Sequence, residues 1–281
     1  MNMHNFTIGA ARNRAVQALT IDQIRKAAPS AFAVEAHSSR SERYAYIPTS
    51  AIIERLFAEG FVCTSAQQAR SRIEGKSEYT KHMLKFSREG QALARVGDSV
   101  PQLALVNSHD GTSRYKLLAG LFRLVCSNGL TVSDGTFGEV SVPHTGDIVG
   151  RVIEGSYQVI EGAEKAGEVA AAWRSIKLNV DEQTQFARAA SLLRWDGIEA
   201  QAPVMPQTLL APRRHEDRAT DLWTTYNVVQ ENMVKGGQRG NTRDAGGRRR
   251  SVRAVKGIDG NVALNRALWA LTEGMAALKA A

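Results

Sequence analysis

Cysteine is scarce in this sequence. The 281 residues include two, Cys63 and Cys126, which lie far apart in apolar stretches. No pair of histidines at metal-ligand spacing accompanies them, so a structural zinc site is not expected. Two isolated thiols of this kind are typical of a reducing compartment rather than of a disulfide-bonded secreted protein. We therefore expect buried thiols and a cytoplasmic location.

Long hydrophobic runs are also missing. No apolar stretch approaches the roughly 20 residues that a membrane-spanning helix needs. The N-terminal segment has no apolar region followed by a cleavage site of small residues, so secretion is not expected. With 43% hydrophobic and 23% charged residues, the composition is that of an ordinary globular protein with a real core. We expect no membrane partner.

Motifs for nucleotide cofactors are absent. The sequence contains no Gly-x-Gly-x-x-Gly, which leaves a dinucleotide site without support. Gly75-Lys76-Ser77 looks like the end of a phosphate-binding loop, but Arg70 stands where that motif needs a glycine. We therefore predict no cofactor and no metal, and we assign no catalytic residue.

Two enzymatic alternatives stay open at this point. Four carboxylates could line a two-metal nuclease site, although their spacing matches no known signature. They are Glu78, Asp98, Asp110 and Asp134. Cys126 could form a nucleophilic pair with His109 or His144. Its position inside an apolar run favours core packing instead.

The most prominent feature that the sequence does have is a basic, glycine-rich segment, residues 235–256. It contains eight lysines and arginines and one acid, Asp244, which amounts to +7 of the whole chain's net charge of +8. The cations are Lys235, Arg239, Arg243, Arg248, Arg249, Arg250, Arg253 and Lys256. Because glycine is costly to order in helices and strands, we predict a flexible loop between two helices.

A cationic loop suits a polyanion, since each phosphate that it neutralises releases condensed counterions. A solvated loop without a partner is the plainer alternative. The concentration of nearly all net charge in one segment favours nucleic acid. We expect further phosphate contacts from cations on the predicted strands, namely Lys81, Lys85, Arg114 and Lys116.

Three aromatic residues, Trp223, Tyr226 and Trp269, lie on the helices predicted to flank the basic loop. Exposed rings at these positions could stack on bases. They also coincide with apolar stripes, which favours core or interface packing for at least Tyr226.

Hydrophobic periodicity predicts the fold class. Short segments between residues 61 and 142 alternate with a period of two, and Asp110-Gly111 is a hairpin signal. In the strand predicted over 79–88, Lys81 and Lys85 share one side, which favours a solvent-exposed cationic face. From residue 146 onward the spacing is helical. We predict an α+β fold, with a curved antiparallel sheet in the N-terminal half packed by a long helix and a helical C-terminal half.

We expect three regions along the chain: a weakly ordered segment at 1–30, then a β-rich part at 31–145 and a helical part at 146–281 of the same domain. Capping boxes at Thr20–Gln23 and Asn179–Glu182 mark two helix starts. A short strand is expected at 44–47. Residues 121–129 fit either a short helix capped by Asn128-Gly129 or a buried strand.

Several short strings together resemble one known family. They are Asn107-Ser-His-Asp-Gly-Thr112, Leu121-Phe-Arg-Leu-Val-Cys-Ser-Asn-Gly129, His144-Thr-Gly146, Ile153-Glu-Gly-Ser-Tyr157, Asp221-Leu-Trp-Thr-Thr-Tyr226, Gln230-Glu-Asn232 and Val255-Lys-Gly-Ile258. This pattern resembles the phage/plasmid-like protein family, catalogued as domain of unknown function number 932, from about residue 30 to residue 278. The resemblance implies a home on bacterial phages, plasmids or integrated elements. It carries no catalytic residues, so Asn107, His109, Asp110, Asn128 and Gly129 are motif residues of unknown role.

The order of elements, strands first and then a long helix with more helices behind, is also similar to Rad52-like single-strand annealing proteins. This is an analogy of fold, and fold alone does not specify function. It implies that subunits assemble side by side and hold single-stranded DNA by its backbone. Proteins of that kind use neither ATP nor a metal.

The sequence thus predicts a cytoplasmic, mobile-element protein that binds single-stranded DNA and anneals it in recombination or replication, without being an enzyme. A homo-oligomer is part of this hypothesis. One alternative is a metal-dependent nuclease or nucleotide-modifying enzyme. Another is a protein-interaction module in defence or anti-defence, whose basic loop faces an acidic partner.

Overall fold

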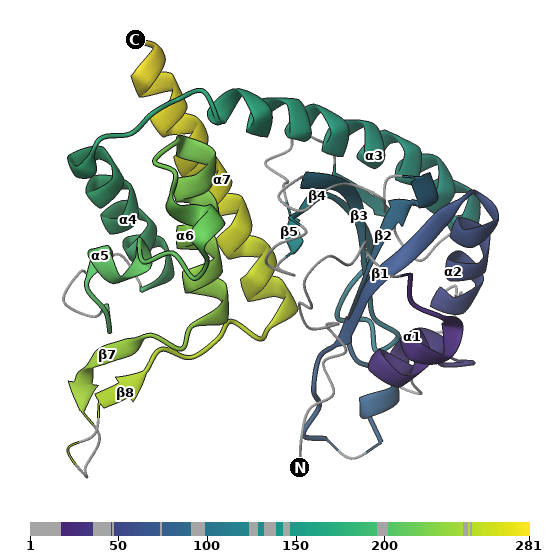
Figure 1. The fold of residues 1–281 in the computed structure, drawn as a ribbon. Coiled ribbons are helices and arrows are strands. Elements are labelled where there is room, and N and C mark those ends of the chain that lie inside the picture. Colours follow the sequence, from purple (N-terminus) through teal and green to yellow (C-terminus); the bar gives the residue numbers. More distant parts are fainter. Residues whose placement is uncertain are drawn as a thin grey trace. The chain divides into compact units, whose positions relative to one another are not determined.

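The computed structural model describes residues 18–35, 46, 48–73, 75–90, 99–123, 129–131, 139–142, 147–195, 202–243, 247 and 249–281 (Figure 1). The chain divides into two compact units, Met1–Gly167 and Glu168–Ala281. The boundary falls within the long helix α3, Ile148–Trp173. The prediction of a single domain with a β-rich part and a helical part stays a prediction.

The first unit is built on a curved, open antiparallel sheet. Its strands are β1 Phe61–Gln68, β2 His82–Arg88, β3 Ser99–Asn107, β4 Tyr115–Arg123, β5 Gly129–Thr131 and β6 Glu139–Val142. They follow the order β1-β2-β3-β4-β5, and β6 also pairs with β4. The expected hairpin around Asp110-Gly111 is confirmed as β3–β4. The α+β prediction is confirmed as well.

Among the described residues, short helical elements accompany the sheet, including α1 Ile21–Ala27, η1 Pro29–Phe32, α2 Thr49–Ala58 and η2 Ser77–Tyr79. The capping box of Thr20 with Gln23 is formed, as predicted. Of the strand expected at 44–47, Tyr46 alone is described, and it lies outside any strand. The segment at 121–129 extends β4 to Arg123 and begins β5 at Gly129, while Asn128 lies outside the described residues.

One face of the sheet packs against α2 and the first part of α3. Phe86 on β2 meets Phe57 of α2 edge to face, with ring centroids 6.4 Å apart. Gly155 of α3 approaches β4 and β6 so closely that a methyl group there would lie 2.7 Å from Val140 Cγ1 and 3.0 Å from Leu117 Cδ1. A glycine that weakens the helix locally therefore permits close contact of helix and sheet.

The opposite side of β2 differs from the prediction of a solvent-exposed cationic face. Met83 and Lys85 are both buried, with 3% and 7% of their surface exposed, and Lys81 is half-buried. The central strands bury residues on both faces, so the alternation of lysine with apolar residues does not indicate a solvent-exposed face here. Long lysine stems can be buried along a sheet in this way.

The second unit consists of helices and one small hairpin. The helices are the end of α3, α4 Val180–Arg194, α5 Pro206–Leu209, η5 His215–Arg218, α6 Leu222–Lys235 and α7 Ile258–Ala280, and the hairpin strands are β7 Arg239–Arg243 and β8 Arg249–Ser251. Helices α4, α6 and α7 pack on one another (Figure 1). The capping box that joins Asn179 and Glu182 at the start of α4 is formed, as predicted.

An aromatic cluster fills the core of the second unit. Trp173 packs against Trp269 with ring centroids 4.4 Å apart, and Trp223 stacks on Tyr226 at 5.4 Å. All four rings are at most 3% exposed. Core packing is thus confirmed for Tyr226, and the interpretation of Trp223 and Trp269 as base-stacking residues is wrong, because both rings are already covered by other side chains.

Two glycine substitutions test the packing of the long helices. We expect Gly155→Ala to lower the free energy of unfolding by about 1–3 kcal/mol, because the added methyl overpacks the contact with Val140. Gly274 on α7 is exposed, and a methyl group there meets nothing within 4 Å. Gly274→Ala should raise stability by about 0.5–1 kcal/mol through helix propensity. Denaturant unfolding of both variants checks the opposite signs, and equal effects would contradict the packing of α3.

Candidate nucleic-acid interface

The basic arm, defined as residues 235–256, contains a two-stranded antiparallel hairpin, β7–β8. The prediction that glycines deny this segment a strand is wrong. Gly236, Gly237 and Gly247 have φ angles of 62°, 87° and 76°, so they serve at chain reversals, where such angles are needed. The glycines end helix α6 and turn the chain back, and the residues between them are left to form the strands.

Backbone hydrogen bonds fix the root of the arm. Gly237 N donates to Val252 O at 2.8 Å, and Val252 N donates to Gln238 O at 2.9 Å. A Cβ atom on Gly236 would lie 2.5 Å from Val252 O, so only glycine allows this approach of the two chains. On the outer edge, Asn241 N of β7 donates to Pro203 O at 2.5 Å. The hairpin is therefore held from both sides.

Two arginines from outside the arm reinforce that root. Arg194, at the end of α4, donates to the carbonyl oxygens of Met233 and Arg253. Arg213 donates to Asn232 Oδ1 at 2.7 Å and to Gly236 O at 2.5 Å. Burial lowers the pKa of the Arg194 guanidinium below its ordinary value. Neither arginine was singled out from the sequence, because no local pattern links Arg194 to carbonyl groups 39 and 59 residues away, or Arg213 to acceptors 19 and 23 residues away.

The arm presents exposed cations. Arg239, Arg249, Arg253 and Lys256 are all exposed, and none of them forms an ion pair with another residue in the described part of the chain. Arg243 and Arg250 lie in the strands, but their side chains fall outside the description, as does the whole of Arg248. These four exposed cations of the arm thus lie on one hairpin and the segment after it.

Lys235 differs from the other cations of the arm. Its Nζ lies 2.7 Å from Oε1 of Glu231, which is 2% exposed. The same carboxylate receives hydrogen bonds from both terminal nitrogens of Arg214, whose Nη1 also contacts Asp217 at 3.2 Å. The buried acids Glu231 of α6 and Asp217 of η5 are therefore paired with cations within the unit, and neither of them compensates the charge of the outer arm.

The other predicted cations belong to the first unit. Arg114 is exposed and Lys116 is half-buried at the start of β4, while Lys85 is buried on β2. These residues are therefore not included in the candidate interface. The candidate interface rests on the arm alone.

The family motif leads to a buried polar cluster. Thr49 Oγ1, at the start of α2, lies 2.9 Å from His82 Nε2 and 3.2 Å from His109 Nε2. Asn107 Nδ2 donates to the same oxygen at 3.1 Å, and His82 Nδ1 lies 3.0 Å from Ser30 Oγ. All five side chains are fully buried. Asn107 and His109 therefore tie α2 to the β3–β4 hairpin.

The hydrogen bonds at Thr49 constrain the imidazoles. The hydroxyl oxygen has two lone pairs and one is taken by Asn107, so the two histidine nitrogens cannot both donate to it. At least one ring nitrogen must accept, which requires a neutral imidazole. Burial, followed by the proximity of His109, lowers the pKa of His82 to about 3. His82 is thus a neutral ring that a proton would disrupt.

The described residues do not assemble the alternative catalytic sites. No group of three or more His, Cys, Asp or Glu side chains among them could hold a metal ion. Asp98, Asp134, Cys126 and His144 lie outside the description. Burial would raise the pKa of Asp110, but hydrogen bonds from the Thr112 side chain and backbone lower it. Asp110 thus anchors its own turn.

The thiol that the structure describes, Cys63, lies in the core. Cys63 is buried, as predicted, and burial raises its pKa to about 12. Separately, none of the helices in the described ranges has the length and apolar character of a membrane-spanning helix.

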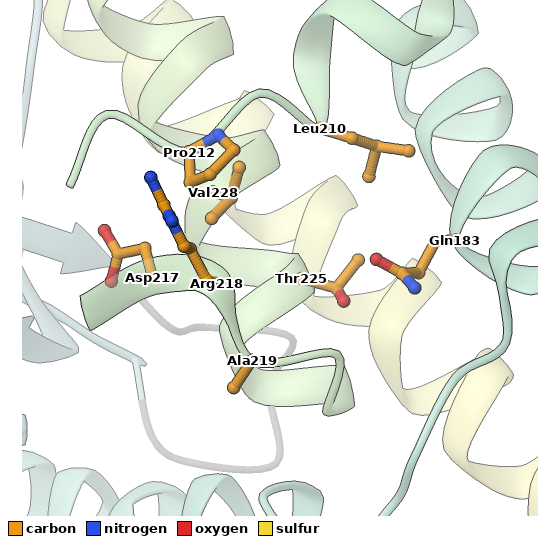
Figure 2. A pocket seen from close by; sticks show the side chains of 8 residues that line it. All are labelled: Gln183, Leu210, Pro212, Asp217, Arg218, Ala219, Thr225 and Val228. Atoms are coloured by element: carbon orange, nitrogen blue, oxygen red, sulfur yellow. The ribbon is translucent and has the colours of Figure 1, made fainter. Parts of the chain in front are cut away.

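A polar pocket of about 190 Å³ lies between α4, η5 and α6 (Figure 2). In Figure 2, the amide of Gln183 points toward Thr225, while Asp217 and Arg218 lie on the other side. The sequence offered no signal for this pocket, since its residues come from separate segments. Because an arginine and a carboxylate line it together, the pocket favours neither an anion nor a cation.

The depressed pKa of His82 predicts acid sensitivity. In the unfolded chain a histidine takes up a proton near pH 6.5, whereas folded His82 does so near pH 3. Stability should therefore be full above pH 6.5 and fall as the pH drops from 6.5 towards 3, by at most about 1.4 kcal/mol per pH unit from this group. NMR should show constant ring shifts for His82 from pH 7 to about 4.5. Titration near 6.5, as in the urea-unfolded chain, would contradict the cluster.

Comparison with known proteins places the chain in a family. A family described as "Domain of unknown function (DUF932)" matches residues 36–269. The chain is similar to two proteins of Escherichia coli (strain K12). It is 48% identical to UPF0380 protein YafZ over 257 residues, which cover 92% of this chain and 91% of YafZ. It is 48% identical to UPF0380 protein YfjQ over 255 residues, 91% of this chain and 90% of YfjQ. No solved structure matches it. Because the family match spans most of the sequence, the chain belongs to the DUF932 family, as its short strings predicted.

Proposed function

We propose that this protein binds nucleic acid through the basic arm and that single-stranded DNA is its favoured ligand. The observation that supports this most directly is the set of exposed cations without ion pairs among the described residues: Arg239, Arg249, Arg253 and Lys256. Arginine presents a planar fork of donors that matches phosphate oxygens. A polyanion is the ligand that engages several such groups at once.

The form of the arm favours a flexible strand as the ligand. A hairpin stabilised at its root presents cations from both strands and from the segment that follows β8. A single strand can bend to bring successive phosphates to these groups. Contacts to phosphates carry no sequence information, so we expect little sequence preference from the arm itself.

In this proposal the phosphates are neutralised by the arm while most bases stay free to pair. That arrangement suits a protein that anneals DNA in recombination or replication on phages or plasmids, the setting that the family resemblance implies. Side-by-side assembly of several copies would extend the grip along the strand. The analogy to Rad52-like proteins rests on the order of elements alone.

A charge-matched pair of variants tests the role of the arm. Changing Arg239, Arg249 and Arg253 to alanine leaves up to three phosphates of the bound strand without a cation. The affinity for single-stranded DNA should fall, and the slope of log affinity against log salt should flatten by about 0.7 for each phosphate that is no longer neutralised. Fluorescence anisotropy over a salt series measures both quantities.

The matched control changes Arg70, Arg72 and Arg218, three exposed arginines outside the arm, to alanine. Net charge falls equally in both variants, so weaker binding confined to the arm variant isolates the site from long-range attraction. Equal weakening in the two variants would refute the arm as the binding site. Including Mg²⁺ in one series shows whether the strand stays intact, and cleavage would favour the nuclease alternative.

A further inference from the structure

A second pocket lies beside the arm, in the same unit. It has a volume of about 210 Å³ and is lined by residues of α4, of α5 with the segment leading into it, and of β7. Its lining includes Gln185, Met205, Gln207 and Asn241. The backbone hydrogen bond from Asn241 N to Pro203 O fixes β7 against this wall. Strand β7 thus belongs both to the arm and, through Asn241, to the wall of the pocket.

The chemistry of the lining matches an unpaired nucleobase. Gln185, Gln207 and Asn241 are exposed carboxamides, and each offers both a donor and an acceptor, as the edge of a base requires. Met205 is 58% exposed, which is unusual for a thioether, and it supplies an apolar surface for a flat ring. No other exposed methionine is described in this unit.

The volume of the pocket also fits a single ring system. A cavity of about 150 Å³ accepts benzene, so about 210 Å³ holds one base with its exocyclic groups but not a base pair. A base inside a duplex would have to leave the stack to enter. The pocket therefore selects for single strands, which phosphate contacts alone cannot do.

Strand β7 carries an exposed cation and an exposed base-reading group two residues apart. Arg239 and Asn241 are both exposed, while Gly240 between them is buried. Two positions along an extended chain span about 7 Å, so the two side chains begin close together. A nucleotide can thus set its phosphate against Arg239 while its base turns toward Asn241.

We infer that the pocket between α4, α5 and β7 binds one unpaired nucleobase of the strand whose phosphates the basic arm holds. The inference rests on the proposed function, which it deepens: the arm supplies affinity for the backbone, and the pocket supplies the preference for single-stranded ligands.

Two ligands and two variants test it by fluorescence anisotropy at one fixed salt concentration. The ligands are an oligothymidylate and an abasic oligomer with the same number of phosphates. The unmodified protein should bind the oligothymidylate roughly five- to a hundredfold more tightly, the range expected for one stacked base. Met205→Ala combined with Gln207→Ala should remove most of that difference and leave the abasic affinity unchanged. Both side chains are exposed, so folding should be kept.

Leu278→Ala, an exposed apolar residue outside the pocket, is the matched control and should change neither affinity. Equal binding of the two ligands by the unmodified protein, with normal salt dependence, would overturn the nucleobase pocket and leave the arm proposal standing. The nucleobase pocket would also be overturned, with the arm proposal standing, if the pocket variant lost equal affinity for both ligands or lost affinity for neither. Absence of salt-dependent binding to either ligand would overturn the arm proposal and the pocket together.

Discussion

The second unit depends on one requirement: the carbonyl oxygens at the end of α6 need hydrogen-bond donors. A helix leaves its last carbonyl groups without backbone partners, and here the chain must also reverse at Gly236. Arg194 donates to the carbonyl oxygen of Met233 and Arg213 to that of Gly236, and Arg194 also donates to the carbonyl oxygen of Arg253 in the segment after β8. The Arg194 guanidinium thus hydrogen-bonds both the end of α6 and the segment that follows the hairpin. Together with Arg213 it fixes the root of the arm from outside the arm.

Features that depend on neighbours in sequence could be predicted. Both capping boxes are formed, at Thr20 and at Asn179, because each needs only a side chain three residues away. The β3–β4 hairpin follows from its Asp-Gly turn. The fold class follows from the change of period near residue 146, which is also a local property.

Features that depend on distant partners could not be predicted. His82 and Thr49 are 33 residues apart, and Asn107 is 58 residues from Thr49, so no spacing announces that they share a hydroxyl. Lys85 sits in an alternating pattern that looks half-exposed, yet both sides of its strand are covered. In the basic arm, glycine content suggested a loop, because propensity does not count the hydrogen bonds that pairing with a second strand adds.

The positive charge is concentrated in one segment, and this location matters in a way that the net charge of the chain does not. Outside residues 235–256 the chain is nearly balanced, with 28 lysines and arginines against 27 acids. At physiological salt the field of an exposed charge is screened within about 8 Å, so a diffuse surplus would attract a strand without orienting it. A surplus confined to a hairpin acts only on phosphates that reach it. Under the proposed function, a strand held there would also lie within reach of the neighbouring pocket, so the position of the charge, rather than its total, would decide which part of the protein the strand contacts.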